Sequence, residues 1–221
     1  PVRVSATIYG TLIHQTIEDI HRTVLRGEES KITKENIESW FLSNYKSIVA
    51  KEKVFLAPQI QKSAIDQLNR YADRHSTQWD RIKETEVDVS LVKSDYILKG
   101  TIDLSRGEND TIEIVDFKSE KKPDIFSNSD KLDRYRRQLE IYAHLVEERT
   151  GQKVSKLHLY YTGAGESESP YISFPKNESS IDNTIKVFDD IVNSIERKDF
   201  KPCKKDPKQC KECDMRFYCR T

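Results

Sequence analysis

Hydrophobic positions recur at helical spacing in the first third of the chain and then change to strand spacing. Over residues 9–27, isoleucine and valine recur every three or four positions and form one apolar stripe, as in an amphipathic helix. Residues 85–92 alternate between apolar and polar positions, as in a half-buried strand. The whole pattern predicts helices at 9–27, 31–50 and 57–83, strands at 85–92, 95–105 and 111–118, a helix at 130–149, strands at 156–163 and 170–175, and a helix at 179–197.

This order of elements predicts one α/β domain over residues 1–221, a length that suffices for a sizeable core. Three consecutive strands joined by short polar turns indicate an antiparallel meander. We divide the expected domain into a helical part at 1–84, a sheet core at 85–175 that contains the helix at 130–149, and a C-terminal helix and tail at 179–221.

Composition narrows the function classes only a little. Lys plus Arg and Asp plus Glu both number 37, so net charge gives no argument for or against nucleic acid. No apolar run is long enough to span a membrane, and no signal peptide opens the chain. We therefore expect a cytoplasmic protein without a membrane partner.

Two carboxylates carry the first chemical signal. Asp116 and Lys118 lie one residue apart at the end of a predicted strand, so their side chains share a face. Asp103 lies on the polar face of the preceding strand, beside Gly100, which leaves room for a close approach. If the two strands pair, both carboxylates can meet, and a pair of hard oxygen ligands suits Mg²⁺ or Mn²⁺. Such a site with a neighbouring lysine is suited to phosphodiester hydrolysis.

Four segments, in this order, carry a family resemblance: "YGTLIHQTIEDIHR", "GTIDLS", "IVDFKSEKK" and "YRRQLEIYAHLV". Together they resemble the PD-(D/E)xK nuclease superfamily, and within it the RecB-type nucleases fused to UvrD/Rep-type helicases and the AddB-like subunits. The resemblance implies a restriction-endonuclease-like core, with a mixed sheet of about five strands flanked by helices.

The resemblance also implies roles for individual residues. His14, Asp103, Asp116 and the backbone carbonyl of Phe117 would be metal ligands, and Lys118 would be the catalytic lysine. Gln138 and Tyr142 would line the catalytic site and contact DNA or orient the lysine.

The residues alone leave alternatives to these roles. His14 directly follows Ile13 of the apolar stripe, so it could be a half-buried structural histidine. Gln138 and Tyr142 are one helical turn apart, so they could simply pack against each other. Glu86 is a candidate for a further acidic group. We interpret His21 and Glu18 as helix-surface residues, with Glu18 a candidate to support the ligands from outside.

The tail holds all four cysteines, Cys203, Cys210, Cys213 and Cys219, in a C-x6-C-x2-C-x5-C array. Four clustered thiolates indicate a metal centre rather than disulfides. Zinc and a 4Fe–4S cluster both fit four thiolates, and the C-x2-C-x5-C run resembles that of iron–sulfur members of the nuclease branch. In many of those the fourth cysteine lies far upstream. Here only Cys203 is available for that place, and the alternative is a fourth cysteine in a segment before Pro1.

We therefore expect a metal-dependent DNA nuclease of exonuclease type, acting on single-stranded ends or unwound duplex. A helicase in the same chain or in a partner subunit would supply the strand during double-strand break repair. Two alternatives are a CRISPR-associated spacer-acquisition nuclease and a non-catalytic DNA-binding scaffold held together by its metal cluster. The presence of His14, Asp103, Asp116 and Lys118 together argues against the scaffold.

Overall fold

The computed structural model describes residues 2–93, 96–107, 111–125 and 129–199, together with 210, 213 and 216. Its main chain divides into two compact units, Pro1–Thr184 and Ile185–Thr221. The first unit contains the sheet and the first four α-helices. Within the described helices, none is both long and apolar enough to cross a membrane.

The N-terminal part is an assembly of three helices, α1 (Val2–Leu25), α2 (Lys34–Glu52) and α3 (Pro58–His75). Gly27 adopts a φ of 71° just after α1, a left-handed conformation that glycine adopts without strain. Thr33 caps α2 by accepting a hydrogen bond from the N–H of Asn36. Pro58 begins α3, at a position where its missing N–H costs nothing. Two short 3-10 turns, η1 (Glu29–Lys31) and η2 (Trp79–Arg81), follow α1 and α3.

The sheet has five strands in the order β1-β2-β3-β4-β5. The strands are β1 (Ile82–Val92), β2 (Ile97–Arg106), β3 (Thr111–Lys118), β4 (Lys153–Tyr161) and β5 (Tyr171–Pro175). Strands β1, β2 and β3 form the expected antiparallel meander. Strand β4 is parallel to β3, and the crossover between them contains α4 (Ser129–Thr150). The sheet is therefore mixed, and the expected α/β fold with about five strands is confirmed.

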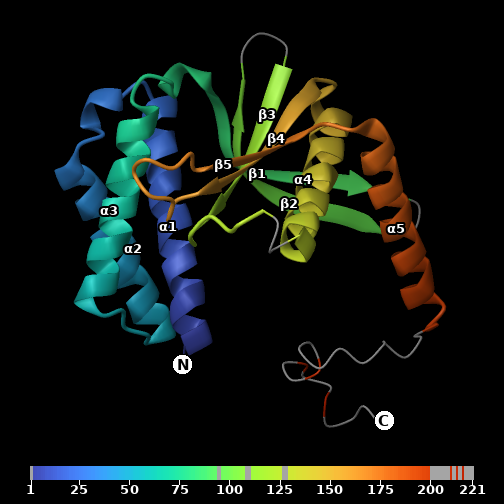
Figure 1. The fold of residues 1–221 in the computed structure, drawn as a ribbon, viewed down its shortest axis with the longest axis horizontal. Helices are drawn as coiled ribbons and strands as arrows, with labels where there is room; N and C mark the ends of the chain where they lie inside the picture. Colours follow the sequence, from blue (N-terminus) through green and yellow to red (C-terminus); the bar gives the residue numbers. More distant parts are fainter. Residues whose placement is uncertain are drawn as a thin grey trace. The chain divides into compact units, whose positions relative to one another are not determined.

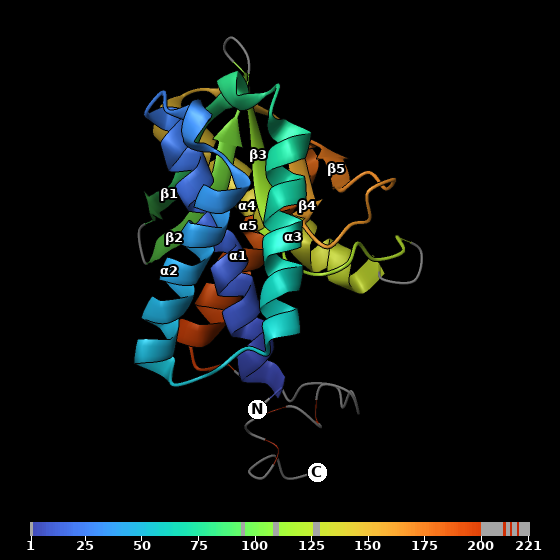
Figure 2. The ribbon, with the colours of Figure 1, turned by 90° about the vertical axis from the view of Figure 1, so that its left-hand side faces the viewer.

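The helices cover both faces of the sheet. In Figure 1 and Figure 2, α1, α2 and α3 lie together on one side of the strands, and α4 lies on the other. A buried apolar cluster joins the three N-terminal helices to the sheet through four side chains, Leu104, Val115, Phe117 and Tyr160. Helix α5 (Glu178–Glu196) begins in the first unit, where the Thr184 hydroxyl donates to Glu140 of α4.

Several expected element boundaries were wrong. The first helix begins at Val2 rather than at residue 9, and β1 begins at Ile82 rather than at residue 85. The third helix ends at His75 rather than at residue 83, because Ile82 already pairs with Arg106 of β2, and sheet pairing overrides local helical preference. Strand β4 begins at Lys153, three residues earlier than expected, since Lys153 pairs with Thr111 at the start of β3.

Candidate active site

The site begins where β2 and β3 separate. Their ladder has three registered pairs and ends at Leu104 and Val115, so Asp103 and Asp116 are the next residues in register. The N–H of Phe117 donates to Asp103 Oδ2 at 2.7 Å, in place of a backbone carbonyl. The carboxylate of Asp103 thus occupies the place of a ladder bond. The parity expected from the sequence brings the two acidic residues together.

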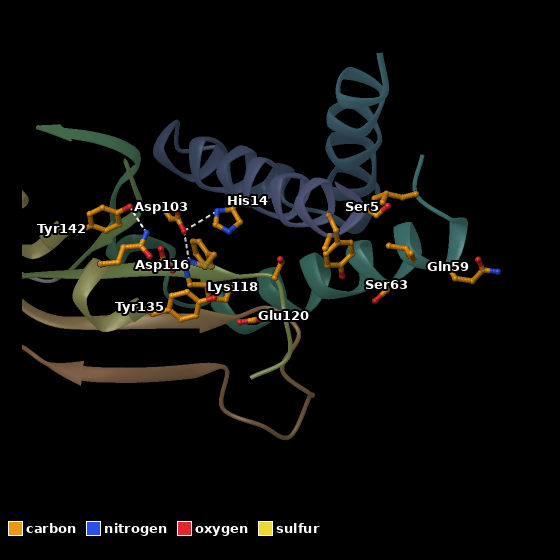
Figure 3. A pocket seen from close by; sticks show the side chains of 17 residues that line it. Ser5, His14, Gln59, Ser63, Asp103, Asp116, Lys118, Glu120, Tyr135 and Tyr142 are labelled. Carbon is orange, nitrogen blue, oxygen red and sulfur yellow. Dashed lines mark hydrogen bonds and ion pairs between the residues drawn. The ribbon is translucent and has the colours of Figure 1, made fainter. Parts of the chain in front are cut away.

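Helix α1 brings His14 to Asp103. The His14 Nδ1 atom lies 3.4 Å from Asp103 Oδ2, and Figure 3 shows the imidazole directed at that carboxylate. A Cβ added at Gly10 would lie 3.1 Å from the Ser119 hydroxyl, so the absent side chain lets α1 approach the end of β3. The glycine and histidine of "GTLIH" therefore act together, one by allowing the approach and the other by reaching the carboxylate.

Glu86 completes a tight group with these two residues. One ligand atom each from His14, Glu86 and Asp103 lies within 4.8 Å of the other two. The flanking pairs Thr85–Leu104 and Val87–Ile102 put Glu86 opposite Asp103. Glu86 has a φ of 49°, a left-handed conformation that costs a non-glycine residue about 1–3 kcal/mol and often marks functional sites. The signal that identifies Glu86 from sequence is its register across the short β1–β2 turn.

The acidic residues repel one another in the absence of a cation. Burial first, and then the charges of Asp103 and Glu18, raise the pKa of Glu86 to about 7. Burial and the charge of Asp103 raise the pKa of Asp116 to about 6, against the opposing Lys118 and His14. Burial disfavours protonation of His14, but its hydrogen bond to Asp103 and the surrounding negative charges outweigh burial and raise its pKa. Carboxylates held close together with raised pKa values fit a divalent cation.

Lys118 lies against Asp116 as the strand parity predicted. Its Nζ is 2.5 Å from Asp116 Oδ2, and both side chains are mostly buried. The same ammonium lies 4.0 Å from the ring centroid of Tyr135 in α4, a cation–π contact. These two contacts hold the lysine at the end of β3 beside the carboxylates.

Helix α4 contributes Gln138 and Tyr142. The Gln138 amide donates to the Tyr142 hydroxyl at 2.9 Å, and both line the same groove as Asp116 and Lys118. The space beside Gly100 is filled by Tyr142, since an added Cβ would lie 2.5 Å from its Cε1. Gly100 therefore admits a tyrosine from α4, where the sequence suggested a general close approach.

The expectation that His21 lies on the helix surface was wrong. His21 is fully buried, its Nε2 lies 2.5 Å from the Tyr71 hydroxyl, and its Nδ1 lies 3.1 Å from Thr85 Oγ1. The Thr85 hydroxyl donates to the Asp103 carbonyl, so Thr85 must accept from His21, which assigns the Nδ1–H tautomer. Burial lowers the pKa of His21 to about 3, so it is neutral near pH 7. Tyr71, His21 and Thr85 form a directed chain of donors that ends on the backbone of Asp103.

The other expected site residues have mixed outcomes. Glu18 pairs with Arg22 on α1 and borders the space between His14 and Glu86. The ring of Phe117 packs against His14, His21 and Tyr71, and whether its carbonyl binds a metal stays a prediction. Cys203 and Cys219 lie outside the described residues. Among the described residues, Cys210 and Cys213 form no disulfide, and the Cys213 N–H donates to the Cys210 carbonyl with an N–O distance of 3.4 Å.

A groove of about 910 Å³ opens from these residues along α1 and α3. Figure 3 shows His14, Asp103, Asp116 and Lys118 at one end and Ser5, Ser63 and Gln59 toward the other. The acidic group and the lysine are therefore accessible to a ligand larger than a single phosphate.

Known proteins are similar to this chain in sequence or in fold. The model of the PD-(D/E)XK nuclease superfamily matches residues 1–220. The chain is 31% identical over 156 residues to an ATP-dependent helicase/nuclease subunit of Clostridium novyi, covering 66% of this chain and 11% of that protein. It is 40% identical over 65 residues to the corresponding protein of Carboxydothermus hydrogenoformans, covering 29% of this chain and 6% of that protein. The chain thus spans about a tenth or less of these curated relatives.

A solved structure supports the fold assignment. The crystal structure of a candidate exonuclease from Eubacterium rectale has a TM-score of 0.52 to this chain at 15% identity. The match covers 87% of this chain and 73% of that one. At this level of identity the likeness shows the fold alone.

Proposed function

Because the chain belongs to the PD-(D/E)XK nuclease superfamily, we propose that it is a metal-dependent deoxyribonuclease domain of exonuclease type. The observation that carries the proposal is the convergence of His14, Glu86 and Asp103 beside the Asp116–Lys118 pair. We propose that residues 1–221 form one nuclease domain, and every described member of this site lies in the first compact unit.

The donor set fits a hard divalent cation. Two carboxylates and an imidazole present ligand atoms within 4.8 Å of one another, and oxygen-rich sets of this kind suit Mg²⁺ or Mn²⁺. We propose His14, Asp103 and Asp116 as ligands, with Glu86 as a further one and the Phe117 carbonyl as a backbone ligand. When bound, the cation would neutralise charge on the scissile phosphate and favour activation of water.

The remaining residues have distinct tasks in phosphodiester cleavage. The Lys118 ammonium lies where it can stabilise the negative charge that grows on the phosphate in the transition state. Tyr135 restricts the lysine, and the ion pair with Asp116 keeps its charge at the end of β3. Gln138 and Tyr142 border the groove from α4, where their amide and hydroxyl can bind the phosphate backbone.

The relatives suggest the setting of this activity. Both curated matches are subunits of ATP-dependent helicase/nucleases, so we propose that a UvrD/Rep-type helicase, in the same chain or a partner subunit, delivers unwound DNA. The role that we propose is processing of DNA ends in double-strand break repair. A test is co-purification of the nuclease activity with ATP-dependent unwinding of linear duplex.

A cleavage assay tests the catalytic site. Linear single-stranded and duplex DNA are incubated with the chain and Mn²⁺, and Asp116→Asn and Lys118→Ala are assayed beside it. We expect both variants to lose cleavage while they keep a cooperative thermal transition. Asp88→Ala and Lys122→Ala are matched controls, because both side chains lie outside the groove, and they should cut like the parent. Parent-like cleavage by both site variants would show that the assignment is wrong.

We also propose that Cys203, Cys210, Cys213 and Cys219 bind a 4Fe–4S cluster, with Zn²⁺ as the alternative. The support is the C-x6-C-x2-C-x5-C spacing, which lets one turn hold two thiolates and leaves two more to complete the ligand set. Anaerobic purification followed by metal analysis and visible absorption separates the two. A colourless protein with stoichiometric zinc would contradict the iron–sulfur proposal.

A further inference from the structure

We propose that the part of the groove beyond the acidic residues binds unstacked nucleobases of a single DNA strand whose phosphate lies at the carboxylates. This inference rests on the proposed nuclease function and adds a subsite to it. The subsite, which we call the base groove, is formed by α1, by the start of α3 and by Leu56 just before α3. Its lining residues on the two helices are Ser5, Ala6, Tyr9, Gln59, Ile60 and Ser63.

The base groove has the length of a short oligonucleotide. Ser5 and His14 lie nine residues apart on α1. At about 1.5 Å per residue, the groove runs roughly 13 Å along the helix. A stacked nucleotide rises about 3.4 Å, so this length accommodates at most about four nucleotides, and fewer when their bases are unstacked. Figure 3 shows Ser5, Ser63 and Gln59 set away from His14 and Asp103 along α1 and α3. A strand anchored at the carboxylates can therefore extend along it.

The lining chemistry favours bases over phosphates. Among the described residues that line the whole groove, the only lysine or arginine is Lys118, which is engaged with Asp116. Surfaces that follow a phosphate backbone carry many basic side chains, because charge neutralisation dominates that contact. The base groove instead presents apolar side chains together with hydroxyl and amide groups. This combination matches the flat apolar faces and polar edges of nucleobases.

Tyr9 supplies a half-buried aromatic ring that lines the groove. Burial raises the pKa of Tyr9, against the opposing effects of the Ser63 side chain on α3 and of the Arg70 charge, so the phenol stays neutral. Ile60 adds a large apolar side chain that is 42% exposed. An aromatic ring and an exposed isoleucine that line the same groove provide a surface on which a base can stack.

A duplex cannot use this surface, because its bases are already stacked and paired. Base–aromatic stacking contributes about 1–3 kcal/mol per base and is tolerant of sequence. The base groove should therefore select unpaired strands without selecting a sequence.

The test compares strands with and without bases. Fluorescence anisotropy measures binding of an end-labelled single-stranded oligodeoxynucleotide in Ca²⁺, and a gel confirms that the probe stays uncut. A second probe carries abasic sites throughout, so that its phosphates remain. Tyr9→Ala should weaken binding of the base-bearing strand about 5- to 150-fold, the range of one lost stacking contact. The same variant should bind the abasic strand within about twofold of the parent.

Two further variants keep the test decisive. Ile60→Ala removes a side chain that is 42% exposed, and it should weaken binding of only the base-bearing strand. Ile97→Ala is its matched control, since Ile97 is 55% exposed on β2 and does not line the groove, and it should bind both probes like the parent. Tyr9→Phe keeps the ring and should bind like the parent.

The outcomes separate this inference from the nuclease proposal. Unchanged binding of the base-bearing strand by both Tyr9→Ala and Ile60→Ala would overturn the base groove, even if Asp116→Asn abolishes cleavage. Equal weakening of both probes would also overturn it, because the contacts would then be to the backbone. The predicted binding pattern in a protein that never cuts DNA would support the base groove and reject the nuclease.

Discussion

Acid should destabilise the fold through His75, and the structure gives the size of the effect. His75 is buried, its Nδ1 lies 2.8 Å from the Tyr71 carbonyl, and its Nε2 lies 2.8 Å from the Tyr171 hydroxyl. That hydroxyl already accepts a hydrogen bond from Arg106, so it donates to His75, and a second proton on the ring would face a donor and a cation. Burial lowers the pKa of His75 to about 4. The hydrogen bond to Tyr71 opposes this shift, and the charges of Arg106 and Arg74 add to it.

The sign follows from which state binds the proton. In the unfolded chain the histidine pKa is about 6.5, so between pH 6.5 and pH 4 the unfolded state binds more protons and stability falls as pH falls. Integrating from pH 7 to pH 5, His75 alone should lower the free energy of unfolding by about 2 kcal/mol. For a domain of this size the corresponding drop in melting temperature is about 4 °C.

The measurement compares the parent with His75→Gln, which can still hydrogen-bond but does not titrate. Urea unfolding at pH 7 and pH 5 gives the free energy of each protein, and other titrating groups contribute equally to both. We expect the parent to lose about 2 kcal/mol more than the variant over this interval. Equal losses in the two proteins would refute the assignment of a buried neutral histidine.

Three further predictions concern the site and its supports. Gly163→Ala should lower stability by about 1–3 kcal/mol in thermal unfolding, because a Cβ there would lie 2.6 Å from the Glu120 carbonyl, and an unchanged transition would contradict that packing. Thr85→Val should lower DNA cleavage and stability, by about 1–3 kcal/mol for the latter, because it leaves two buried polar groups without partners. Thr85→Ser keeps the hydroxyl, so it should retain DNA cleavage and stability close to those of the parent. A loss as large as that of Thr85→Val would argue against the hydroxyl as support for Asp103. Glu86→Gln should raise the Mn²⁺ concentration for half-maximal cleavage at least about tenfold, and an unchanged titration would exclude Glu86 as a ligand.

The order of elements could be predicted because each has a clear period or turn. The stripe from Ile13 to Val24 and the alternation from Val87 to Leu91 depend only on which side chains become buried. Boundaries were less predictable where strand pairing decides them. Ile82 is an example, because its partner Arg106 lies on the neighbouring strand but far along the sequence. No local signal marks such a pairing.

The site was predictable where strand parity or a short motif fixes it. Asp103 and Asp116 follow from alternation, and Lys118 follows from its spacing to Asp116. The closeness of Glu86 to His14 and Asp103 was less predictable. Register places it opposite Asp103, but its left-handed backbone conformation within a strand is not revealed by a sequence pattern. His21 was misassigned because α3 covers its side of α1, and only the packed helices show that contact.

The position of Asp103 relative to Asp116 depends on the register of the short ladder between β2 and β3. A slip of one residue would set Leu104 opposite Asp116 and turn one carboxylate toward the wrong face. Lengthening the connection after Gly107 would leave the paired residues in place and add only a modest closure entropy. The connection between β2 and β3 can therefore change in length, whereas a single deletion inside either strand would separate the two carboxylates and abolish the proposed site.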